Sequence, residues 1–210
     1  MKNLFIAFCI VSLFASCFSF TQFQTGKTSG KGEADFGATL NGAAIGSSGT
    51  FGSLPLSIPE FQGNVGLSDK FDLTFKYNFP AGLYVGGKYN IFGNEVDSKA
   101  SLAVGANIGG LVFSAKGVSD SKLNTAGFYI FSLPLHFSFQ PSPIFTIGIS
   151  PNYTKLGFFG NSEEIGGNLI GIAPHFEVGK RIKFIVGGNL LFSVDGTGGT
   201  FTSYGLGIKF

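Results

Sequence analysis

Apolar residues recur at every second position along most of this chain, in runs separated by clusters of Gly, Asn, Asp, Ser and Pro. A period of two places successive side chains on opposite faces of an extended strand. The clusters between the runs are typical of turns and loops. The pattern predicts about ten strands, at residues 31–43, 55–66, 70–78, 81–92, 98–109, 125–139, 143–157, 166–179, 182–193 and 199–210.

The last of these strands has the clearest alternation. Tyr204, Leu206, Ile208 and Phe210 share one face, whereas the other face carries only Ser, Gly and Lys. A final strand with alternating apolar residues and a terminal aromatic resembles the signal by which the barrel-assembly machinery recognises bacterial outer-membrane β-barrels. The resemblance implies an all-β fold, a closed antiparallel up-and-down transmembrane β-barrel.

The composition supports a chain whose surface faces lipid. Charged residues make up 12% of the chain, and there are 33 Gly, 26 Phe and no Trp, whereas a soluble domain carries about 25% charge. No apolar run after position 20 is long enough for a membrane helix. A closed sheet is the other way to cross a bilayer with every backbone group paired. The net charge of +2 is too small to indicate a nucleic acid partner.

The connections between the predicted strands alternate in length. Those after the second, fourth, sixth and eighth strands are mostly very short, as periplasmic turns are, and both termini are then periplasmic. The longer ones, expected to be external loops, are 44–54, 110–124 and 159–167. This alternation favours ten strands over eight or twelve.

The N-terminus has the pattern of an export signal. Lys2 precedes an apolar stretch that is too short to span a membrane, so residues 1–16 are predicted to be a signal peptide. Cys17 after small residues resembles the acylation site of a lipoprotein, and the alternative is ordinary cleavage after Cys17 or Ser19. Residues 17–30, rich in Thr, Ser and Gly, are then a tether, and residues 31–210 form the barrel.

The two faces of the predicted strands differ in polarity. One is apolar and should face lipid, whereas the other carries charges of both signs, which usually pair in a narrow interior. We predict a charged, hydrogen-bonded plug in the periplasmic half of the lumen, and an outer vestibule lined by small neutral groups such as Ser101 and Thr146. The inward charge network comprises Glu33, Asp35, Glu60, Asp72, Lys76, Lys88, His136, His175, Glu177, Lys183 and Lys209.

The two histidines do not indicate catalysis or metal binding. His136 and His175 fall on strands separated by a third, too far apart for one zinc ion. His175 and Glu177 lie side by side on one strand and are predicted to form a hydrogen-bonded pair within the plug. We therefore predict no catalytic residue, no metal and no cofactor.

Two further stretches have a resemblance of their own. QTGKTSGKGEADFGATLNG and VGLSDKFDLTFKYNFPAGLYVGGKYNIF resemble small lipidated or secreted outer-membrane barrels of poorly assigned function. These motifs carry no catalytic residue, and we predict a non-enzymatic barrel in the bacterial outer membrane, with a structural role or an interaction role through its long loops; the small-molecule or extracellular ligand is left unknown. The alternative is a narrow channel or transporter for a small molecule.

Overall fold

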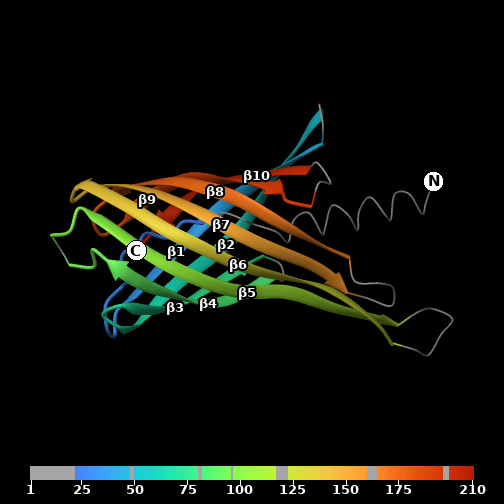
Figure 1. The fold of residues 1–210 in the computed structure, drawn as a ribbon, viewed down its shortest axis with the longest axis horizontal. Helices are drawn as coiled ribbons and strands as arrows, with labels where there is room; N and C mark the ends of the chain where they lie inside the picture. The colour runs from blue at the N-terminus through green and yellow to red at the C-terminus, as the bar shows by residue number, and fades with distance from the viewer. Residues whose placement is uncertain are drawn as a thin grey trace.

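The computed structural model describes residues 22–47, 50–79, 82–95, 97–116, 123–159, 165–195 and 199–210. Within them, ten strands pair antiparallel with their neighbours in the chain, and β10 pairs with β1 to close the barrel (Figure 1). This confirms the predicted fold class. The strands are β1 (Ala34–Ser47), β2 (Thr50–Ser68), β3 (Phe71–Asn78), β4 (Gly82–Phe92), β5 (Ala100–Lys116), β6 (Leu123–Ser142), β7 (Phe145–Phe159), β8 (Ile165–Gly179), β9 (Lys183–Ser193) and β10 (Gly199–Lys209).

The barrel has two distinct ends. We call the end that carries the start of β1, Phe210 and the turns after β2, β4, β6 and β8 the base, which lies at the left of Figure 1. The opposite end, where β1 joins β2 and β5 joins β6, is the rim. Three of the four turns at the base are short, such as the one between β6, which ends at Ser142, and β7, which begins at Phe145, whereas the β4–β5 connection spans residues 93–99.

Two of the expected long loops are wrong. Residues 44–54 and 110–124 consist mostly of strand, because Ser47 pairs with Thr50 across the β1–β2 hairpin and Lys116 pairs with Leu123 across the β5–β6 hairpin. The alternation of apolar and polar side chains is weak in these two stretches. The strands nevertheless continue, because the backbone hydrogen bonds that pair them do not depend on the side chains. Of the third expected loop, residues 160–164 lie outside the described part of the chain.

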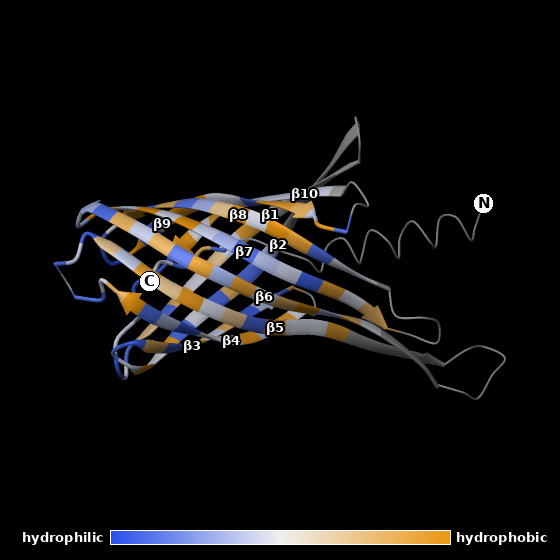
Figure 2. Ribbon diagram, viewed as in Figure 1, coloured by the Kyte–Doolittle hydropathy of each residue, from blue (hydrophilic) through white to orange (hydrophobic). Residues whose placement is uncertain are grey.

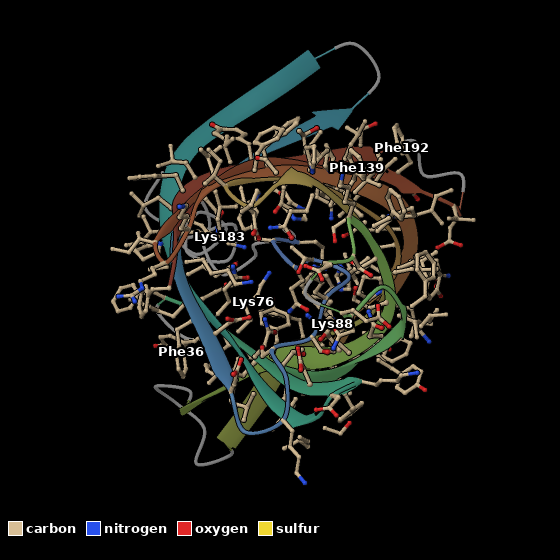
Figure 3. The ribbon with its side chains drawn as sticks, turned by 90° about the vertical axis from the view of Figure 1, so that its left-hand side faces the viewer. Phe36, Lys76, Lys88, Phe139, Lys183 and Phe192 are labelled. Atoms are coloured by element: carbon tan, nitrogen blue, oxygen red, sulfur yellow. The ribbon has the colours of Figure 1, made fainter. Side chains whose placement is uncertain are left out.

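The outer face of the barrel is apolar and the inner face polar. Hydropathy alternates along the strands in Figure 2, and Figure 3 shows Phe36, Phe139 and Phe192 outside the wall with Lys76 and Lys88 inside it. The outward side chains follow the predicted parity. No helix in the described ranges is long and apolar enough to cross a membrane.

A charge on the outer face should destabilise the protein. Leu206 is 62% exposed and lies four residues before Phe210. A strand rises about 3.3 Å per residue and is tilted by about 40°, so Leu206 lies about 10 Å above the base. Leu206→Arg is expected to lower the free energy of unfolding in lipid vesicles by about 2–4 kcal/mol. Leu67→Arg, one residue before β2 ends at the base, should change it by less than about 1 kcal/mol. Equal losses from both variants, measured by urea titration, would contradict a lipid-facing belt.

Candidate functional site in the barrel lumen

Residues 22–30, which we call the inserted segment, lie inside the barrel. Phe23 is 2% exposed, and Thr25 is buried as well. The interpretation of residues 17–30 as a tether therefore does not hold for residues 22–30, whereas residues 17–21, with Cys17, and the predicted signal peptide lie outside the described residues. An extended segment has unpaired backbone donors and acceptors, and the polar inner face of the barrel provides partners for them.

The middle of the inserted segment is fixed to the β4 and β6 strands. The side-chain amide of Asn90 donates to the Gly26 carbonyl at 2.6 Å, and the Gly26 amide donates to Ser138 Oγ at 3.1 Å. Lys88 Nζ donates to the Lys27 carbonyl at 2.7 Å. Both backbone groups of Gly26 are thus bound to inward side chains.

The end of the inserted segment is fixed at the base. The Ser29 amide lies 3.1 Å from both carboxylate oxygens of Asp72, and its hydroxyl donates to Asp35 at 3.0 Å. The Thr28 amide donates to Asn94 Oδ1 in the β4–β5 turn at 2.8 Å. These bonds connect the segment to β1, β3 and the β4–β5 turn, so its end is held against this part of the wall at the base.

The inward charges form ion pairs between neighbouring strands. Lys88 Nζ lies 3.2 Å from an Asp72 oxygen, and both side chains are almost fully buried, at 2% and 0% exposure. The other three pairs are more open to solvent on one side or both. They are Lys76 with Glu60 at 3.2 Å, Lys183 with Glu177 at 2.9 Å, and Lys209 with Asp35 at 3.5 Å.

One member of the predicted charge network is not in the lumen. Glu33 precedes β1 and is exposed at the base, where its amide donates to the Gly30 carbonyl at 3.1 Å. The alternation that placed it inward applies only within a strand, and β1 begins one residue later. The prediction for Glu33 is therefore wrong.

The two histidines are buried but do not act as predicted. His136 Nδ1 lies 2.8 Å from Ser150 Oγ, whereas neither ring nitrogen of His175 has a hydrogen-bond partner among the described residues. The predicted His175–Glu177 hydrogen bond is wrong, because Glu177 instead accepts from Lys183, and a charge-assisted bond is stronger than a neutral one. The His175 ring instead lies 6.5 Å from the Phe23 ring, edge to face.

The rim half of the lumen contains an apolar cluster. Tyr84, Phe128 and Ile130 are buried against one another, and a cavity of about 40 Å³ lies between this region and Phe23. The prediction of an outer vestibule is wrong for Ser101 and Thr146, which line a cavity at the base instead. Residues 128–131 read FYIF, so both faces of β6 are apolar there and the alternation gave no signal.

Hydrogen bonds between Asp195 and Asn168 connect the chain after β9 to the start of β8 at the rim. The Asn168 amide donates to the Asp195 carboxylate at 2.8 Å, and the Asn168 side chain donates at 3.2 Å. The backbone bond, followed by the side-chain bond, lowers the pKa of Asp195 below its ordinary value. In the described part of the chain, no group of three or more His, Cys, Asp or Glu residues could hold a metal ion.

Three solved structures resemble this chain in fold. Ail, the attachment invasion locus protein of Yersinia pestis, is 9% identical over 86% of this chain and 99% of its own, with a TM-score of 0.40. Neisserial surface protein A is 10% identical (84% and 95% covered, TM-score 0.39). The outer membrane protease OmpT from Escherichia coli is 11% identical (84% and 95% covered, TM-score 0.44). No protein-family model and no curated protein matches the sequence.

Proposed function

We propose that this chain is a non-enzymatic integral barrel of the bacterial outer membrane, closed by its own residues 22–30, with a structural or interaction role. The observation that carries the proposal is the inserted segment, whose Gly26 amide and carbonyl are both bound to inward side chains of the wall. A barrel used for passive conduction would not need its own chain fixed across the lumen. An interaction role would use the rim, which is the end of the barrel that faces away from the periplasm in this proposal.

The outer face supports residence in a membrane. Large apolar side chains such as Leu83, Ile108 and Ile170 are more than half exposed around the wall, and water would not stabilise such a continuous apolar surface. The short turns at the base favour a periplasmic base, because outer-membrane barrels have short periplasmic turns and longer external connections. Both the start of β1 and Phe210 would then face the periplasm.

The buried side chains support a non-enzymatic role. Ser150 and His136 are hydrogen-bonded, but their exposures are 0% and 1%, and the inserted segment lies in the same half of the lumen. If Ser150 were a nucleophile and His136 its base, a third group would have to orient the imidazole. His136 Nε2 has no hydrogen-bond partner among the described residues.

Planar-bilayer recording of the refolded full chain tests the closed state. We expect no steady openings at neutral pH, because the inserted segment and the ion pairs occupy the lumen, and an open porin in the same chamber provides the positive control. Steady unitary openings of the unmodified protein would favour the alternative, a narrow channel. The cavity of about 40 Å³ in the rim half holds a few water molecules at most, so transport would require the segment to move.

A further inference from the structure

We infer that the cavity at the base is a binding site for a small soluble oxyanion of the phosphate class. The cavity has a volume of about 170 Å³ and lies between the inserted segment and the barrel wall. Four lysines line it, together with one carboxylate, and these are Lys27, Lys99, Lys183, Lys209 and Asp35. The inference goes beyond the proposed function, since such a site could exist whether or not the barrel conducts.

The four lysines approach the cavity from different elements. Lys27 belongs to the inserted segment and Lys99 to the turn before β5, while Lys183 and Lys209 lie on β9 and β10. Two of them already have carboxylate partners, Lys183 with Glu177 at 2.9 Å and Lys209 with Asp35 at 3.5 Å. Among the residues that line the cavity, the four lysine charges exceed the single carboxylate of Asp35.

Hydroxyl residues complete the lining, and these are Thr25, Thr28, Ser101, Ser138 and Thr146. The Thr28 hydroxyl donates to the Asp69 carbonyl, and the Ser101 and Ser138 hydroxyls share one hydrogen bond, which leaves one hydroxyl proton of that serine pair for an anion. A tetrahedral oxyanion presents oxygens in several directions and so suits donors distributed around a cavity, whereas a carboxylate has two oxygens in one plane. Lysine ammonium groups bind phosphate as point charges and do not require the planar geometry of arginine.

Lys27 lies near charges of both signs. Burial, and after it the nearby Lys183 ammonium, lowers the pKa of Lys27, whereas Asp97 and Glu95 partly oppose this shift. An anion bound between Lys27 and Lys183 would reduce the repulsion between their ammonium groups. The Lys27 Nζ also donates to the Glu95 carbonyl at 3.2 Å, and this bond holds the lysine near the mouth of the base.

The position of the cavity favours a soluble ligand over a lipid headgroup. Lys183 and Lys209 point to the inside of the wall and keep partial exposure, at 26% and 12%; Figure 3, seen from the base, shows Lys183 within the ring of strands. The strands therefore separate the cavity from the surrounding bilayer. An anion would enter from the solution at the base.

Titration of the full chain in phosphatidylcholine nanodiscs with inorganic phosphate and with pyrophosphate tests the site by calorimetry. We expect saturable binding at one site, and weakening of about tenfold or more in the double variant Lys27→Gln/Lys99→Gln. These two lysines are chosen because changing them leaves both carboxylate pairs in place. Lys180→Gln is the matched control, since Lys180 lies at the same end in the β8–β9 turn and does not line the cavity.

Three outcomes would overturn the inference. The first is the absence of saturable heat with either anion at millimolar concentrations. The second is equal weakening by Lys180→Gln, which would indicate diffuse surface charge. The third is binding of phosphatidylglycerol by the protein, without binding of free phosphate, which would indicate a site for a lipid headgroup. The circular dichroism spectrum and heat-modified migration of each variant would confirm that it remains folded.

Discussion

Gly26→Leu is expected to turn the closed barrel into a conducting pore. A Cβ atom at Gly26 would lie 2.5 Å from the Ser101 carbonyl oxygen and 2.9 Å from that of His136. Both are backbone atoms of paired strands and cannot yield as a flexible side chain would. The inserted segment would have to leave its position, with loss of its bonds to Asn90 and Ser138, each worth about 1 kcal/mol.

The matched control for this experiment is Gly167→Leu. Gly167 is also a strand glycine, on β8, but nothing lies within 4 Å of a Cβ atom added there. In planar bilayers, steady openings are expected from Gly26→Leu and silence from Gly167→Leu. A chain that lacks residues 22–26 should behave like Gly26→Leu. If both altered chains fold and remain silent, the segment does not close the pore.

The path of the inserted segment could not be predicted from the sequence. Apart from Phe23, residues 22–30 are Gln, Thr, Gly, Lys and Ser without periodicity, and such a composition is equally typical of a linker. Its position depends on hydrogen bonds to Asn90, Ser138 and Asp72, which lie 43 to 112 residues away in the chain. The strands and their lipid-facing side could be predicted, because alternation is a local signal.

The partners of the inward charges depended on strand register. Asp72 and Lys88 face each other across β3 and β4, whereas Lys183 pairs diagonally with Glu177, since Lys183 itself faces Gly179. A one-residue shift would move each side chain to the other face. The sequence therefore predicted a network of charges but not its pairs, and it wrongly joined His175 to Glu177 because they share a strand.

Asp72→Asn is expected to destabilise the barrel more than any other change to its ion pairs. Removal of one partner leaves a buried charge uncompensated, which costs about 3–5 kcal/mol, and the Lys88 ammonium is only 2% exposed. The carbonyls of Lys27 and Thr25 still accept from Lys88 Nζ, at 2.7 and 3.4 Å, so a loss of about 3 kcal/mol is expected. Urea unfolding in lipid vesicles measures it.

Asp35→Asn provides the control, because it breaks a pair in which the Asp35 side chain is 40% exposed and should cost about 0–1 kcal/mol. The double variant Asp72→Asn/Lys88→Gln should be more stable than the sum of its single changes implies, since it removes the uncompensated charge as well. Additive losses, or equal losses at Asp72 and Asp35, would show that water reaches the Lys88–Asp72 pair. The inserted segment would then leave a wet passage along β3 and β4, and the closed lumen would depend on its other contacts alone.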